Sequence, residues 1–394
     1  MSEPTFPDAE ASVDSIDPDR LYEQVDGGDE VTILDVRATS EYEKWHISGE
    51  NVTDTNVPYF EFLDGVSDDL LEQVPTGDPL VVICAKESSS EFVAGQLIEA
   101  GYDAVTLAGG MNEWARVFRA EEIAADTDAT VLQYERPSSG CLSYLLVSEG
   151  EAVVVDPLRE FSERYAADAA AHGAELTYAM DTHIHADHVS GARAVAAETG
   201  AKSAYPKAAL DRGTDFEPDR VLEDGDELAV GAATVTVKHT PGHTTGMTSY
   251  LLDDAVLFTG DFLFVESVAR PDLEEGEDGA PDAARTLYDS LQDLRDLPES
   301  TVVAPGHVSD SAKRSDDGTY TDTLGDLFER MSALSMDRES FVKFVLSDMP
   351  ERPSNYEDII ATNLGTRATD DEEAFELELG PNNCAASQED LTER

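Results

Sequence analysis

Short apolar runs alternate with a helical pattern in the first third of the chain. Val31–Val36, Leu80–Cys84 and Ala104–Leu107 have strand length, and Ser90–Ala100 has the apolar spacing of a helix. Strands that alternate with helices usually pair in parallel, because the helix returns the chain to the starting edge of the sheet. The pattern predicts a small α/β domain with a parallel sheet.

A second alternation begins near residue 130 and predicts a two-sheet α/β sandwich. Val189–Thr199 and Ala283–Leu294 are expected helices, and the polar segments Glu274–Asp282 and Ser309–Thr321 are expected loops. The remainder is expected to be helical to about Leu346 and then irregular. The predicted strands are Thr130–Tyr134, Ser143–Val147, Ala152–Asp156, Leu176–Asp181, Thr234–Thr240, Ala255–Thr259 and Thr301–Ala304.

Breaks in these patterns predict the domain organisation. Residues 1–18 form a polar lead-in, residues 19–122 the first domain, 127–330 the second and 331–394 a C-terminal extension. An acidic, Ala-rich stretch around Ala120–Thr130 is the expected linker. A chain of 394 residues is long enough for two domains of ordinary size.

The charge balance is extreme, with 84 acidic and 26 basic residues and a net charge of −58 spread along the chain. Because 41% of the residues are hydrophobic, the chain can still fill globular cores, and the acids are expected on the surface. We interpret this balance as adaptation to high salt, in preference to an acidic protein of an ordinary cytoplasm. No basic stripe is present, which argues against nucleic acid and anionic membranes as partners.

The N-terminus and the cysteines indicate the compartment. Met1–Glu10 has neither a basic start nor an apolar run, and no stretch of ~18 apolar residues occurs, so a cytoplasmic location is expected. Cys84, Cys141 and Cys384 are too few and too widely separated for a disulfide framework. We expect reduced thiols that act singly.

Candidate metal ligands gather directly after a predicted strand and at three later turns. His183, His185, Asp187 and His188 lie within six residues, and imidazole and carboxylate are ligand types that suit zinc and non-haem iron. Each later candidate follows a strand and a Gly-containing turn, so all seven are expected to converge at one sheet edge. These later candidates are His243, Asp261 and His307.

This motif set resembles the metallo-β-lactamase superfamily over about residues 127–310. The resemblance implies an αββα sandwich, and it leaves the reaction open because the superfamily contains hydrolases, nucleases and sulfur oxygenases. Phe262–Phe264, Ala269–Asp272 and Leu287–Leu291 are most similar to persulfide dioxygenases, including those fused to rhodanese domains. The C-terminal piece is similar to the extension of such fusions.

The sequence is compatible with two alternative kinds of metal centre. The dioxygenase resemblance implies one Fe(II) per chain on His183, His243 and Asp261, with the other four residues orienting ligands or moving protons. A glyoxalase II-like thioester hydrolase would instead hold two Zn²⁺, with Asp261 bridging them. In that alternative His183, His185 and His243 bind one zinc, and Asp187, His188 and His307 bind the other.

Arg270 is the candidate for binding an anionic substrate near this site. The alternative for Arg270 is a surface ion pair with neighbouring acids.

The first domain resembles the rhodanese family over about residues 13–120. The resemblance rests on Leu34–Arg37, Val81–Cys84 and Gly109–Met111 in that order, and it implies a three-layer α/β domain with Cys84 as a nucleophile. Cys84 ends a strand before a short loop and a helix, so backbone N–H groups and the helix N-terminus favour its thiolate. Lys86 is a candidate for attracting an anionic sulfur donor. The alternative is an inert thiol in a regulatory domain.

Together the two domains predict an enzyme of sulfane-sulfur metabolism. Sulfur would be carried on Cys84, and a low-molecular-weight thiol persulfide would be oxidised to sulfite with O₂ at the metal. The alternatives are the thioester hydrolase, with a thioester substrate, and a non-catalytic sulfur-sensing or scaffold protein. The family resemblance is also compatible with a homodimer.

The charge balance predicts that dilute buffer destabilises the fold. In molar salt the Debye length is ~3 Å, which screens carboxylates that repel one another at low salt. Thermal unfolding should therefore shift to lower temperature as KCl is reduced from about 3 M to about 0.1 M. A Tm that does not depend on KCl concentration would contradict the high-salt interpretation.

Overall fold

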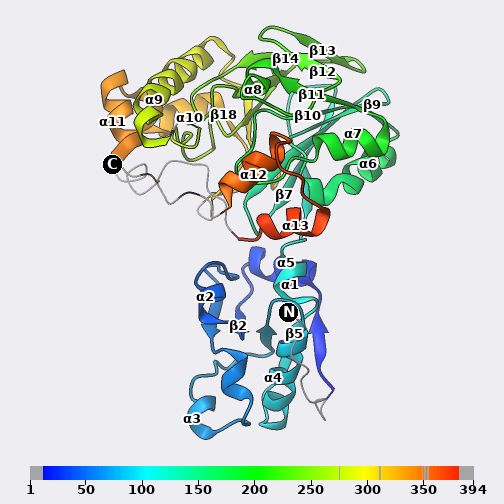
Figure 1. Cartoon of the computed structure of the whole chain (residues 1–394), viewed down its shortest axis with the longest axis vertical. Coiled ribbons are helices and arrows are strands. Elements are labelled where there is room, and N and C mark those ends of the chain that lie inside the picture. The colour runs from blue at the N-terminus through cyan, green and yellow to red at the C-terminus, as the bar shows by residue number, and fades with distance from the viewer. Residues whose placement is uncertain are drawn as a thin grey trace. The chain divides into compact units, whose positions relative to one another are not determined.

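The computed structural model describes residues 12–274, 276–309, 312–347, 349, 352 and 355–380. It divides into two compact units (Figure 1). Unit 1 contains Met1–Phe118 and Arg136–Ser139, and unit 2 contains Arg119–Glu135 and Gly140–Arg394. Cys384 lies outside the described residues.

Unit 1 is built on five strands, which are β1 (Asp14–Ile16), β2 (Val31–Asp35), β3 (Val52–Asn56), β4 (Leu80–Ile83) and β5 (Ala104–Leu107). Its helices are α1 (Pro18–Asp26), α2 (Thr39–Tyr42), η1 (Tyr59–Phe62), α3 (Asp68–Leu71), α4 (Ser88–Glu99) and α5 (Gly110–Trp114).

The sheet of unit 1 has the order β1-β5-β4-β2-β3, and every neighbouring pair of strands is parallel. Successive strand residues face opposite sides, and both sides are buried. Leu34 and Val82 pack in one cluster with residues of α4, and Ile33 and Val81 pack in another with residues of α1 and α5. The predicted three-layer α/β domain with a parallel sheet is confirmed.

Unit 2 contains thirteen strands among the described residues, namely β6 (Arg119–Glu122), β7 (Thr130–Arg136), β8 (Cys141–Ser148), β9 (Glu151–Val155), β10 (Glu175–Met180), β11 (Lys202–Pro206), β12 (Arg220–Leu222), β13 (Glu227–Val230), β14 (Ala233–His239), β15 (Thr248–Leu252), β16 (Val256–Gly260), β17 (Val302–Pro305) and β18 (Asp322–Thr323). Its helices are η2 (Arg159–Phe161), α6 (Ser162–Ala171), α7 (Ala192–Thr199), α8 (Lys207–Leu210), α9 (Gly276–Asp293), η3 (Leu294–Asp296), α10 (Leu324–Arg330), η4 (Ser332–Ser335), α11 (Arg338–Ser347), α12 (Tyr356–Asn363) and α13 (Asp371–Leu377). Among the described residues, no helix has the length and apolar character that crossing a bilayer requires.

Two sheets form the sandwich of unit 2, with the orders β12-β11-β10-β9-β8-β7-β6 and β13-β14-β15-β16-β17-β18. Val153 and Met180 of the first sheet share a core with Tyr250 and Phe258 of the second. On the outer face of the second sheet, Leu257 packs in a cluster with residues of α9, α10 and α11. Helices α6 and α7 contact the first sheet through β10 (Figure 1). The αββα architecture implied by the sequence is confirmed.

The structure differs from the predicted elements at several places. Helix α9 begins at Gly276, inside the predicted loop, because Ala280, Ala284 and Leu287 bury one face despite the local Gly and Pro residues. The region after Leu346 is not irregular throughout, since it contains α12 and α13. The predicted linker begins with β6, which pairs antiparallel with β7.

Gly110 shapes the loop that follows Cys84. Its φ is +63°, and an added Cβ would lie 2.4 Å from the carbonyl oxygen of Cys84 and 2.5 Å from that of Lys86. The next residue, Met111, donates its backbone N–H to the Cys84 carbonyl at 2.9 Å. Only glycine allows this approach of α5 to the Cys84 loop.

Replacing Gly110 with alanine should therefore destabilise unit 1. We expect a loss of about 2–4 kcal/mol in the free energy of unfolding, because backbone strain adds to a clash with two carbonyls. Both tryptophans of the chain, Trp45 and Trp114, belong to unit 1, so tryptophan fluorescence during denaturant unfolding reports on it. The matched control is Gly28→Ala, at φ +80° with nothing within 4 Å of an added Cβ, which should cost only about 1–2 kcal/mol. Equal losses in the two variants would contradict the packing argument.

Candidate metal centre

The seven predicted ligands come from four loops of unit 2 and are all buried. The first four follow β10, in a loop that we call the metal loop (residues 183–190). His243 lies between β14 and β15, Asp261 directly follows β16, and His307 follows β17. Strands β16 and β17 are parallel neighbours, so their carboxyl ends lie side by side. The structure therefore brings all seven residues to one edge of the sandwich.

Three of these residues present ligand atoms to one another. The Oδ2 atom of Asp261 lies 3.8 Å from Nε2 of His183 and 3.8 Å from Nε2 of His243. None of the three atoms has a hydrogen-bond partner among the residues that the structure describes, although all are buried. Buried polar atoms without partners are rare because they lose their hydration without compensation. The residues present thus fit a bound metal cation.

Hydrogen bonds on the far sides of the rings fix which nitrogen of each histidine can bind a metal. Nδ1 of His243 lies 2.9 Å from the carbonyl oxygen of Arg270, which can only accept, so Nδ1 carries the proton. The hydroxyl of Thr182 donates to Asp156 at 2.9 Å and therefore accepts from Nδ1 of His183 at 2.9 Å. In both rings Nε2 keeps its lone pair and faces Asp261.

Burial shifts the pKa values of these three residues. It lowers the pKa of His183 well below its usual value, and it also lowers the pKa of His243. Both rings are therefore neutral, as metal ligation requires. Burial, together with the nearby Asp187, raises the pKa of Asp261. A cation beside Asp261 would favour its charged form.

His185 is engaged differently. Its Nε2 lies 3.1 Å from Oδ1 of Asp156, and its Nδ1 lies 3.7 Å from Oδ1 of Asp187. Burial alone would lower the pKa of His185, but these carboxylates outweigh burial and raise that pKa well above its usual value. Both ring nitrogens of His185 thus lie near carboxylate oxygens of the protein.

A second group surrounds Asp187. Its Oδ2 accepts from Nδ1 of His188 at 3.1 Å and from Sγ of Cys141 at 3.3 Å, and it lies 3.7 Å from Nδ1 of His307. Within the described part of the chain, Nε2 of His188 and Nδ1 of His307 have no hydrogen-bond partner. Cys141, Asp187 and His307 are close enough to share an ion, as are His185, Asp187 and His188.

Sequence reasoning missed Asp156, Thr182 and Cys141. Asp156 accepts from the backbone N–H of Thr182 at 2.6 Å as well as from its hydroxyl, and so fixes the start of the metal loop. Its φ of +50° is uncommon for a residue other than glycine, and only the structure shows this signal. Cys141 stands opposite His307 in a β-bridge.

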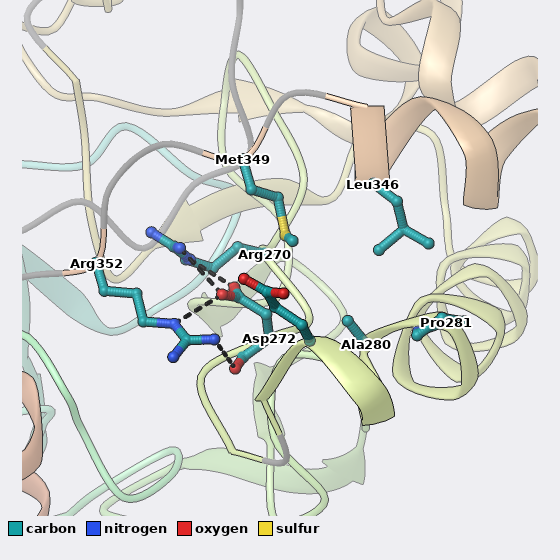
Figure 2. Close-up of a pocket in the computed structure, with 8 residues that line it drawn as sticks. Arg270, Asp272, Ala280, Pro281, Leu346, Met349 and Arg352 are labelled. Atoms are coloured by element: carbon teal, nitrogen blue, oxygen red, sulfur yellow. Dashed lines mark hydrogen bonds and ion pairs between the residues drawn. The ribbon is translucent and has the colours of Figure 1, made fainter.

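Arg270 lies beside a cavity of about 600 Å³ that Figure 2 shows in close-up. The arginine is buried, and its Nε lies 2.8 Å from Oδ1 of Asp272. Nε of Arg352 also donates to Asp272, at 2.9 Å. Arg270 thus forms a buried ion pair, not a surface one, and its carbonyl orients the ligand His243. The cavity is lined by Arg270, Asp272, Glu277, Ala280, Pro281, Leu346, Met349 and Arg352.

In unit 1, Cys84 directly follows β4 and is buried. Its Sγ donates to Oγ of Ser90 at 3.2 Å, and that hydroxyl donates to the carbonyl of Glu87 at 2.8 Å. Helix α4 begins at Ser88, two residues earlier than predicted, so the loop is only three residues long. The side chain of Lys86 in this loop is exposed.

Comparisons with known proteins agree with this architecture. The family model of the metallo-beta-lactamase superfamily matches residues 136–307, and that of the rhodanese-like domain matches residues 17–117. Persulfide dioxygenase ETHE1 of Bos taurus is 32% identical over 181 residues, which are 44% of this chain and 66% of that protein. A hydroxyacylglutathione hydrolase of Brucella anthropi is 41% identical over 136 residues, 34% of this chain and 48% of that protein.

A solved structure gives the same picture. The crystal structure of ETHE1 from Myxococcus xanthus superposes with a TM-score of 0.51 at 29% identity, and the match covers 64% of this chain and 100% of that one. The chain spans about two thirds of the length of the Bos taurus persulfide dioxygenase and about half of the length of the Brucella anthropi hydroxyacylglutathione hydrolase. The chain belongs to the metallo-beta-lactamase superfamily and carries an N-terminal rhodanese-like domain.

Proposed function

We propose that unit 2 is a mononuclear Fe(II) oxygenase that oxidises a low-molecular-weight thiol persulfide to sulfite. The observation that carries the proposal is the group of three buried, unpartnered ligand atoms on His183, His243 and Asp261. Two histidines and one carboxylate on one face are typical of non-haem Fe(II) oxygenases. The similarity to persulfide dioxygenases supports the same substrate class.

The proposed reaction balances as persulfide, O₂ and water giving thiol, sulfite and two protons. When bound, Fe(II) would supply open coordination positions for O₂ and the terminal sulfur. The protein keeps the histidine ligands neutral and holds each ring through Nδ1, so that both Nε2 atoms face the same point. The burial of all three side chains limits the access of bulk water.

We further propose that the cavity beside Arg270 receives the non-reacting part of the thiol. The guanidinium groups of Arg270 and Arg352 line the cavity beside the carboxylates of Asp272 and Glu277, and they supply the hydrogen-bond donors that a substrate carboxylate requires. Leu346 and Met349 add apolar surface to the lining of the cavity (Figure 2). The cavity also adjoins the backbone segment that orients His243.

A dizinc thioester hydrolase remains the second candidate because of one observation. Nε2 of His188 and Nδ1 of His307 are buried and unpartnered next to Asp187, where a second ion would lie. The similarity to a hydroxyacylglutathione hydrolase is consistent with this alternative. Against it, Nε2 of His185 lies 3.1 Å from Oδ1 of Asp156, so that ring nitrogen is already engaged.

In unit 1 we propose that Cys84 carries sulfane sulfur. Its thiolate would attack the outer sulfur of thiosulfate and release sulfite, and a thiol would then take the sulfur from the Cys84 persulfide. The exposed Lys86 would attract the anionic donor. Each transfer exchanges one S–S bond for another and needs no oxidant.

Substitution of the metal ligands tests the iron proposal. His183→Ala, His243→Ala and Asp261→Asn should each reduce iron from about one per chain to near zero and abolish O₂ uptake, because each removes one of three ligands. His188→Ala should keep its iron, since His188 would not be a ligand. The control is His172→Ala, an exposed histidine at the end of α6. Loss of half of a two-ion complement in His188→Ala would identify a dinuclear site instead.

Substitution of Cys84 tests sulfur transfer. Cys84→Ser should lower thiosulfate-dependent sulfur transfer at least about 100-fold, because a hydroxyl is a much weaker nucleophile than a thiolate. Oxygen uptake that is driven by thiosulfate and a thiol should fall with it, while metal content stays the same. Cys384→Ser is the matched control. Oxygen uptake that is unchanged in Cys84→Ser would contradict the proposed coupling of the two activities.

A further inference from the structure

The C-terminal helices of unit 2 contact the metal loop directly. Asn363, the last residue of α12, is 3% exposed and lies against residues 185–190. Its side-chain Nδ2 donates to the carbonyl of His185 at 3.0 Å and to that of His188 at 2.8 Å. Its Oδ1 accepts from the backbone N–H of Ser190 at 2.9 Å. One amide group thus fixes three backbone groups of the metal loop.

An amide is chemically suited to this position. The metal loop contains neither helix nor strand between residues 183 and 189, so these buried carbonyls lack partners from regular secondary structure. An asparagine side chain donates from one end and accepts at the other, whereas an aspartate of the same shape can only accept when charged. The two carbonyls that Asn363 binds stand on either side of Asp187 in the chain.

Other contacts of the extension reinforce this attachment. Oε1 of Glu378, just after α13, accepts from the backbone N–H of Val189 at 2.6 Å and is buried. Tyr356 and Ile360 of α12 pack against an apolar cluster that contains Ala186, in the middle of the metal loop. The extension therefore holds the loop through both polar and apolar contacts.

A second connection reaches the other histidine ligand. Arg352 of the extension donates to Asp272 at 2.9 Å, and Asp272 accepts from Arg270 at 2.8 Å. The carbonyl of Arg270 in turn accepts from His243. The C-terminal extension is thereby connected to the segments that supply both histidine ligands, His183 and His243.

We propose that Asn363 is a positioning residue of the metal centre, and that the C-terminal extension sets the affinity of the site for its metal by holding the metal loop. This inference rests on the metal site of the proposed function, and it does not depend on which metal binds or on the reaction. Residues that orient metal ligands typically change metal affinity by about 10–100-fold when they are replaced.

The test uses Co²⁺ as the probe and the full chain in high salt. The metal-free protein is titrated with Co²⁺ in competition with a chromophoric chelator, and circular dichroism checks the fold. Asn363→Asp should weaken Co²⁺ binding about 10–100-fold. The matched control is Asn355→Asp, the same change at the start of α12, which removes one bond to the carbonyl of Leu377 and does not touch the metal loop. Asn355→Asp should bind Co²⁺ like the unaltered protein.

Equal Co²⁺ affinity of a folded Asn363→Asp variant and its control would overturn the inference. If Asn363→Asp does not fold, the same Co²⁺ titration is carried out on Glu378→Ala and Glu378→Gln. Glutamine keeps an oxygen that can accept from Val189, so Glu378→Gln should retain affinity while Glu378→Ala loses it; equal affinities of the pair would overturn the inference. Because Co²⁺ binding needs neither O₂ nor persulfide, an unaltered protein without oxygenase activity would contradict the proposed function and leave this result intact.

Discussion

The burial of three ligand atoms that face one another is the constraint on which the rest of the site depends. His183, His243 and Asp261 lose their hydration and gain no hydrogen bond at these atoms, so a cation is the partner that compensates. Their arrangement requires defined protons on the far sides of both rings. Asp156, acting through Thr182, fixes the proton on Nδ1 of His183, and the carbonyl of Arg270 fixes the proton on Nδ1 of His243. A neutral, fixed pair of imidazoles follows from these few contacts.

The fold places this constraint at the edge where the two sheets end. The metal loop follows a strand of the first sheet, while Asp261 and His307 follow two neighbouring parallel strands of the second. A sheet edge alone does not order the loops, because they contain little regular structure. The C-terminal extension completes the order, with Asn363 and Glu378 bonded to the backbone of the metal loop. The same extension contributes Arg352 to the cavity beside Arg270.

Much of this arrangement could be predicted from the sequence, and the exceptions share a physical cause. The predicted bounds of β5 agree with those in the structure. Histidines and aspartates that follow strands and turns identified the candidate ligands that the structure brings together. The role of Asn363 was invisible because its partners lie 173 to 178 residues away, and that of Asp156 because its partners lie 26 to 29 residues away. Local Gly and Pro residues hid the start of α9, whose helical state depends on tertiary packing. Patterns along the sequence indicate which residues are buried and where turns occur, but they do not indicate which distant polar groups form hydrogen bonds with one another.

Elemental analysis combined with oxygen electrode measurements, on unaltered protein purified in high salt, tests the iron oxygenase proposal most directly. A thiol persulfide is supplied as substrate, and sulfite is measured alongside the O₂ consumed. A mononuclear iron site of two histidines and one carboxylate predicts about one iron per chain and one sulfite formed for each O₂. Two zinc ions per chain, with thioester cleavage and no O₂ uptake, would contradict it.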